Sequence, residues 1–120
     1  MDFHLRAHSV SVDDDTREYA REKIGGAVHQ VLGKEGTRVD VEVASLNHGH
    51  GVPTHRVSVH VFVPHGKTPV VTVEDGEIRA AIDIAADKIW RVVKELQQKR
   101  RVRGRHSGGN GTTPFVGSNL

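Results

Sequence analysis

Two segments of the sequence alternate valine with polar residues, and this alternation constrains the fold more than any other feature. RVDVEVASL, residues 38–46, places Val39, Val41 and Val43 on one face, and HRVSVHVFV, residues 55–63, repeats the pattern. A period of two residues is that of a β-strand with one buried face. The glycine-rich connection NHGHGVPT predicts that the two strands form an antiparallel hairpin. Other elements must therefore cover the valine face.

Shorter segments on either side extend the predicted sheet to four strands. FHLRAH, residues 3–8, alternates apolar and polar positions, and PVVTVE, residues 69–74, follows a turn. Pro69 has no backbone N–H to donate to a neighbouring strand, which suits an edge position.

Apolar residues recur at intervals of three and four in two other segments, which predicts two amphipathic helices. The first follows Asp13, a suitable N-cap, and extends to about Leu32, with acidic residues in its first turn. Gly25 and Gly26 lie in its middle and each costs about 1 kcal/mol relative to alanine. We expect close packing against another element to compensate for them.

The second predicted helix begins after Glu77 and ends at about Arg101, and it carries the longest apolar stripe in the chain. The element order is therefore β-α-β-β-β-α, an α+β two-layer sandwich with two helices on one face of a four-stranded mixed sheet. A right-handed crossover lets strands one and two pair in parallel, and both helices then run in the same direction. We assign residues 1–103 to this domain and residues 104–120, which are glycine-rich and lack periodicity, to a disordered tail.

The amino-acid composition indicates the cellular compartment in which the protein occurs. The chain has no cysteine, which favours a reducing compartment and excludes disulfides. No apolar run is long enough to span a membrane, and the first residues do not resemble a signal peptide. We therefore expect a cytoplasmic protein.

Cations concentrate towards the C-terminal end. Residues 1–87 carry 9 Lys and Arg against 14 Asp and Glu, whereas residues 88–120 carry 8 against 1. A surface that serves only solubility mixes positively and negatively charged residues. The excess of positive charge in residues 88–120 therefore predicts an anionic partner. Basic helix faces suit nucleic acid because Lys and Arg release counterions from phosphates.

If the two helices pack side by side, their basic faces can merge into one strip. Cations suit the last turn of a helix because of its dipole, and we expect Arg103 and Arg105 to lie beyond that turn in a flexible extension. The residues predicted to bind RNA are Arg17, Arg21, Lys23, Lys88, Trp90, Arg91, Lys94, Lys99, Arg100, Arg101, Arg103 and Arg105.

Trp90 lies off the apolar stripe and allows two interpretations. It can stack on a splayed base, or it can lie over the sheet edge or the neighbouring helix with its indole nitrogen in water. The outward positions of the sheet hold no aromatic pair of the kind that stacks bases, so single-strand binding across the sheet is the weaker hypothesis.

Metal binding and catalysis are weakly supported. His48 and His50 lie in the predicted hairpin tip, but two ligands without an identifiable third do not define a zinc site. Asp83 and Asp87 are four residues apart on one helix face, a spacing that fits ion pairs with Arg79, Lys88 or Arg91 on the same helix better than acid–base catalysis. We expect neither an enzyme nor a cofactor.

The segments HSVSVDDDTREYAREKI and EDGEIRAAIDIAADKIWRVVK resemble the ribosome hibernation promoting factors, the bacterial family that includes ribosome-associated inhibitor A and the sigma-54 modulation proteins. The resemblance covers residues 1 to about 101. It implies a fold like a double-stranded-RNA-binding domain, and a site on 16S rRNA of the small ribosomal subunit, in the mRNA and tRNA channel near the A and P sites. Lys23, Lys88, Arg91 and Lys94 match the family's basic positions, whereas Gly26 and Glu95 stand where cations are common.

By this resemblance the chain is expected to inhibit translation by keeping ribosomes inactive under stress. It resembles the short members of the family, which lack a second domain. We expect a monomer or weak dimer, with neither a membrane nor a small molecule as partner. The alternative is a protein-interaction module of the same fold, in which the sheet or tail binds a regulatory protein. The acidic balance of residues 1–87 keeps this alternative open.

Overall fold

The structure consists of a single four-stranded sheet with helices on one face. The computed structural model describes residues 1–33, 37–46, 53–64 and 66–105. β1 (Asp2–His8) pairs in parallel with β2 (Arg38–Leu46), as predicted. β3 (Thr54–Phe62) is antiparallel to both β2 and β4 (Val70–Asp75). Pro69 immediately precedes β4, which lies at an edge. The spatial order of the strands is the same as their order along the chain, β1-β2-β3-β4.

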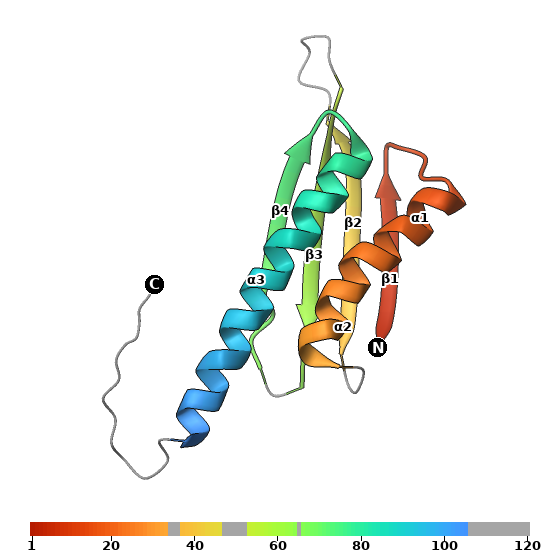
Figure 1. Cartoon of the computed structure of the whole chain (residues 1–120). Coiled ribbons are helices and arrows are strands. Elements are labelled where there is room, and N and C mark those ends of the chain that lie inside the picture. The colour runs from red at the N-terminus through yellow and green to blue at the C-terminus, as the bar shows by residue number, and fades with distance from the viewer. Residues whose placement is uncertain (34–36, 47–52, 65, 106–120) are drawn as a thin grey trace.

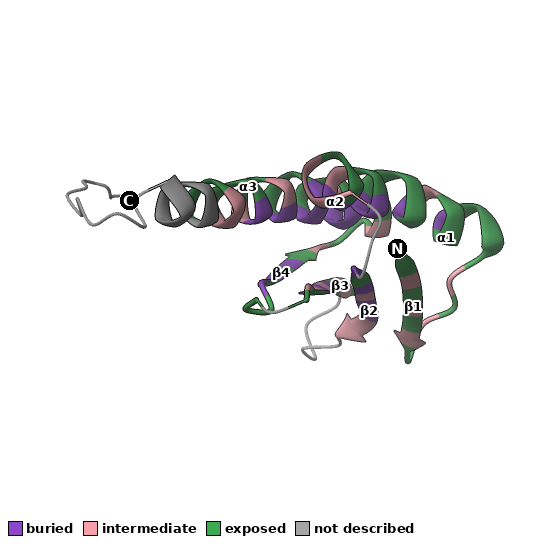
Figure 2. Cartoon of the chain, turned by 90° about the horizontal axis from the view of Figure 1, so that it is seen from below, coloured by how far each residue is buried: buried purple, intermediate pink, exposed green. Residues whose placement is uncertain are grey.

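The helical layer covers the valine face of the sheet (Figure 1, Figure 2). A first helix, residues 14–32, comprises α1 Asp14–Ala20, the π-helical segment η1 Arg21–Gly25, and α2 Gly26–Leu32. α3, Ile78–Arg105, runs beside it in the same direction. The predicted α+β two-layer sandwich is therefore confirmed.

Strand register explains why one face of the sheet is apolar. Val41 of β2 lies opposite Val59 of β3, which lies opposite Val71 of β4, so valines line up across three strands. The valines of β2 and β3 at the alternating positions are 0–1% exposed. Against them pack the fully buried Ile24 and Ile82, from the first helix and α3. Burying a side chain of this size contributes about 1.5–3 kcal/mol, so this layer contact stabilises the domain.

The first helix begins and ends where the sequence predicts. The Asp13 side chain accepts a hydrogen bond from the Thr16 backbone N–H at 2.8 Å, which caps the helix. Gly33 ends it with a positive φ of 77°, a backbone conformation that favours glycine. The π-helical turn η1 was not predicted. π turns of this length insert one extra residue into a helix, and apolar spacing alone does not reveal them.

α3 extends further than predicted. It ends at Arg105 rather than about Arg101, so Arg103 and Arg105 are helical and the predicted domain boundary at residue 103 falls inside the helix. The physical reason is that residues 99–103 are strong helix formers apart from Val102, and that Gly104 is the first glycine within α3. Residues 106–120 of the predicted tail lie outside the described residues. None of the described helices combines the length and apolar character needed to cross a membrane.

Gly25 and Gly26 differ in how closely they are packed. A Cβ added at Gly25 would lie 3.3 Å from the Met1 methyl group and 3.5 Å from the Phe3 ring, whereas one at Gly26 would meet nothing within 4 Å. The expected close packing is thus confirmed at Gly25 only. It brings β1 against the π turn.

Gly26→Ala should raise the free energy of unfolding by about 0.4–1 kcal/mol, because Gly26 has helical angles and open space. Gly25→Ala should give a smaller gain or a loss, because Met1 and Phe3 must shift. Urea unfolding of the two variants, followed by circular dichroism, measures the difference. Equal gains in both variants would contradict the packing of Gly25 against β1.

Candidate nucleic-acid interface

The Lys23 side chain of the first helix points towards α3. Lys23 lies in η1, and its Nζ is 4.0 Å from Asp83 Oδ1 and 5.7 Å from the centroid of the Tyr19 ring. The Tyr19 hydroxyl donates a hydrogen bond of 2.5 Å to the same carboxylate oxygen. The Arg79 guanidinium lies over the Tyr19 ring, 4.7 Å from its centroid. Tyr19, Lys23, Arg79 and Asp83 form what we call the inter-helix cluster, which joins the first helix to α3.

The two aspartates of α3 have different partners. Asp87 pairs with Arg91 on its own helix at 3.1 Å, as predicted. The same prediction was wrong for Asp83, whose contacts are with Tyr19 and Lys23. Helical spacing identifies neighbours along one helix, but it does not reveal a partner on the adjacent helix.

Arg17 and Arg21 lie on the opposite side of the first helix. Arg17 donates a hydrogen bond of 3.1 Å to the backbone carbonyl of Leu5 in β1. Arg21 lies over the Phe3 ring at 5.4 Å and pairs with Glu18 at 3.6 Å. The structure therefore does not bring these two arginines into a strip with the cations of α3, contrary to our expectation, because they face β1.

The exposed side of α3 carries most of the predicted cations that the structure describes. Lys88, Arg91, Lys94 and Lys99 are all exposed. In the part of the chain described, no carboxylate lies within ion-pair distance of the three lysines. The Arg91–Asp87 pair is on the surface, where such pairs contribute about 0–1 kcal/mol, so Arg91 can exchange Asp87 for a phosphate at little cost. Arg100, Arg101, Arg103 and Arg105 continue the same helix.

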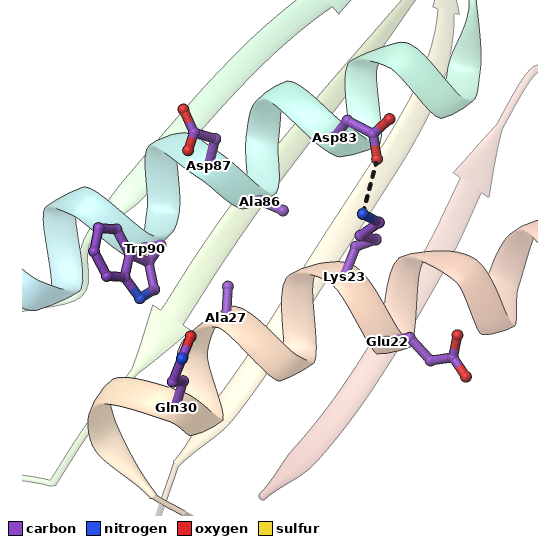
Figure 3. A pocket seen from close by; sticks show the side chains of 8 residues that line it. All are labelled: Glu22, Lys23, Ala27, Gln30, Asp83, Ala86, Asp87 and Trp90. Atoms are coloured by element: carbon purple, nitrogen blue, oxygen red, sulfur yellow. Dashed lines mark ion pairs between the residues drawn. The ribbon is translucent and has the colours of Figure 1, made fainter.

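An open groove of about 360 Å³ lies between the first helix and α3 (Figure 3). Trp90 is half-buried and points across the groove towards Gln30 of α2. Lys94 Nζ lies 4.4 Å from the centroid of the Trp90 ring. The structure places Trp90 beside the neighbouring helix, and base stacking by Trp90 stays a prediction. The groove is lined by Glu22, Lys23, Ala27, Gln30, Asp83, Ala86, Asp87 and Trp90.

The open face of the sheet is less suited to phosphate. Arg56 pairs with Glu74 at 3.2 Å across two strands, and Arg38 pairs with Asp40 at 2.9 Å. The bond from Arg38 holds the pKa of Asp40 below its usual value, which keeps this carboxylate ionised. The Phe62 ring stacks on the ring of His60. The Arg38 guanidinium lies over the Phe62 ring, 5.9 Å from its centroid. Two arginines of this face are thus already engaged with carboxylates.

Among the residues that the structure describes, no three His, Asp or Glu side chains converge as metal ligands would. His48 and His50 lie outside the described residues.

Comparison with known proteins identifies the family. The family model described as sigma 54 modulation protein / S30EA ribosomal protein matches residues 3–101. The chain belongs to this family. Its members are ribosome-associated factors, as the resemblance predicted. No curated protein sequence matches the chain significantly.

Solved structures share the fold of this family member. The Thermus thermophilus Protein Y N-terminal domain is 23% identical, with a TM-score of 0.65; the match covers 80% of this chain and 99% of that domain. A ribosomal subunit interface protein from Coxiella burnetii is 15% identical, with a TM-score of 0.65, and the match covers 82% of this chain and 99% of that protein.

The inter-helix cluster should be visible in a titration of Tyr19, the only tyrosine of the chain. Its hydrogen bond to the Asp83 carboxylate raises the pKa of the Tyr19 hydroxyl above the usual value of about 10. This hydrogen bond should stabilise the fold fully below pH ~10 and be lost as the pH rises through the raised pKa. Tyrosinate absorbance should therefore show a midpoint above 10 that falls in Asp83→Asn.

Asp87→Asn is the matched control for this titration, because Asp87 lies one turn further along α3 and pairs with Arg91 instead. It should leave the Tyr19 midpoint unchanged. Equal shifts in the two variants would argue against a specific Tyr19–Asp83 bond.

Proposed function

We propose that this protein binds the small ribosomal subunit through α3, contacts 16S rRNA in the mRNA and tRNA channel near the A and P sites, and keeps ribosomes inactive under stress. Membership of a ribosome-associated family supports the partner. The observation that carries the surface is the set of exposed lysines along α3, Lys88, Lys94 and Lys99. In the part of the chain that the structure describes, none of them has a carboxylate within ion-pair distance.

The position of α3 suits a charged channel of RNA. Its C-terminal half extends past the end of the sheet, so cations on it can reach phosphates on more than one side (Figure 1). Because residues 99–105 are part of the helix, their backbone is already ordered before binding. Less conformational entropy is then lost on association than with a flexible tail. Lys23 adds a cation from the first helix, at the groove.

Neutralising three cations of α3 should weaken binding to ribosomes and make it less salt-dependent. In Lys88→Gln/Arg91→Gln/Lys94→Gln, each lost phosphate contact lowers the slope of log affinity against log salt by roughly 0.7–0.9. The expected change is about two for the triple variant. Co-sedimentation with purified small subunits over a series of salt concentrations measures it.

The control variant removes the same number of positive charges elsewhere. Arg6→Gln/Arg56→Gln/Lys67→Gln changes exposed cations of the open sheet face and the β3–β4 turn, and it should bind as the unmodified protein does. Equal loss in both variants would indicate net charge rather than a docked surface. Binding that resists ribonuclease treatment of the subunits would favour the protein-interaction alternative.

If this protein occupies the mRNA and tRNA channel, it should compete with both ligands for the small subunit. Small subunits loaded beforehand with mRNA and tRNA should bind less of this protein than empty subunits do, because both ligands would occupy the same space. Co-sedimentation at equal subunit concentration compares the two, with empty subunits at the same salt as the reference. Undiminished binding to loaded subunits would place the protein elsewhere on the ribosome.

A further inference from the structure

Lys23 lies near Asp83 without a hydrogen bond to it. Its Nζ is 4.0 Å from Asp83 Oδ1, whereas an ammonium that donates to a carboxylate lies about 2.7–2.9 Å from the oxygen. One turn further along α3, Arg91 and Asp87 approach each other to 3.1 Å. The Coulomb attraction of Asp83 therefore acts on Lys23, but the N–H groups of the ammonium are not committed to this carboxylate.

A hydrogen bond from Tyr19 accounts for the longer distance. The Tyr19 hydroxyl donates a bond of 2.5 Å to the same Oδ1 atom that is closest to Lys23. A carboxylate oxygen that accepts so short a bond has part of its negative charge neutralised, and the hydroxyl covers one side of it. The tyrosine ring is in contact with the Arg79 guanidinium, 4.7 Å from the ring centroid. Tyr19 thus competes with Lys23 for the oxygen of Asp83.

The Lys23 ammonium is confined and also accessible. Its side chain is 53% exposed, at the opening of the groove (Figure 3). Asp83 attracts it from α3, and the Tyr19 ring lies 5.7 Å from Nζ on its own helix. An ammonium has three N–H donors, so a phosphate can bind it from outside while both attractions persist. A confined lysine also loses less conformational entropy on binding than a freely moving one.

We propose that Tyr19 is a positioning residue for Lys23: it occupies the oxygen of Asp83, so that Lys23 is held at the groove with its donors available to an RNA phosphate. This inference rests on the proposed RNA-binding function. Without the hydroxyl, Lys23 would approach Asp83 to hydrogen-bonding distance, as Arg91 approaches Asp87. The inter-helix cluster therefore sets how far one cation of the first helix is available to RNA.

A double-mutant cycle tests whether Tyr19 acts on RNA binding through Lys23. Tyr19→Phe removes the hydroxyl and changes no charge at neutral pH. It should weaken co-sedimentation with purified small subunits by about two- to fivefold, the scale of one surface electrostatic contact. Lys23→Gln should weaken it at least as much. In the Lys23→Gln background, Tyr19→Phe should have no further effect, because the cation on which it acts is gone.

Lys88 provides the matched control cycle. It is an exposed lysine of α3, and among the described residues no carboxylate lies within ion-pair distance of it. Tyr19→Phe should weaken binding by the same factor in Lys88→Gln as in the unmodified protein. A loss of folding would weaken binding in both lysine backgrounds, so the two cycles separate positioning from a purely structural role.

The free protein gives a readout that does not depend on RNA. In Tyr19→Phe the Lys23 ammonium should exchange its hydrogens with water more slowly, because it then donates to Asp83. The exchange rate of the Lys88 ammonium should stay the same. Nitrogen-15 NMR of the lysine ammonium groups measures both rates. Adding Asp83→Asn to Tyr19→Phe should restore fast exchange at Lys23, because the charged acceptor is removed.

Three results would overturn the inference: an unchanged affinity of Tyr19→Phe, an equal loss in the Lys23→Gln background, or an unchanged exchange rate at Lys23. Any of them, together with normal co-sedimentation of the unmodified protein, would leave the proposed function intact. Failure of the unmodified protein to co-sediment with small subunits would overturn the proposed function and this inference together.

Discussion

The rest of the structure depends on a sheet that is apolar on one face only. The valines of β2 and β3 exclude water only if both helices lie on the same side of the sheet. The parallel β1–β2 pairing, joined by the first helix, and the return through α3 then make the two helices run in the same direction. Hydrophobic burial thus places two exposed helix faces next to each other, which creates the groove and its rim of charges.

Much of the fold can be predicted from the spacing of apolar residues in the sequence. The arrangement of the candidate site can be predicted from it only in part. Alternation in RVDVEVASL predicts β2 and its buried face, and Asp13 marks the start of the first helix, because these signals are local. The side of the helix on which Arg17 and Lys23 lie depends on its rotation, which the π turn η1 alters. Helical spacing shows that both are exposed, but not that one faces β1 and the other α3. The same limit hid the Tyr19–Asp83 bond.

The end of α3 shows how a local rule can mislead. Helical periodicity ended at about Arg101, and with glycine at position 104 we expected Arg103 and Arg105 to lie in a flexible extension. The helix instead continues to Arg105. Repulsion between neighbouring cations is screened by salt, and arginine and lysine have high helix propensity. If this helix end binds RNA as proposed, its backbone is ordered beforehand, so less conformational entropy would be lost on binding.

Carboxylates beside a basic surface give selectivity rather than affinity. A uniformly positive helix layer would attract any polyanion in many orientations. In this protein Asp83 and Asp87 lie between Lys23 on one side and the cations of α3 on the other. A phosphate backbone gains most where it follows the lysines and loses where it crosses the groove. If the domain binds RNA as proposed, the Coulomb energy depends strongly on how the RNA lies across the two helices, and this dependence would restrict the orientation of the bound RNA.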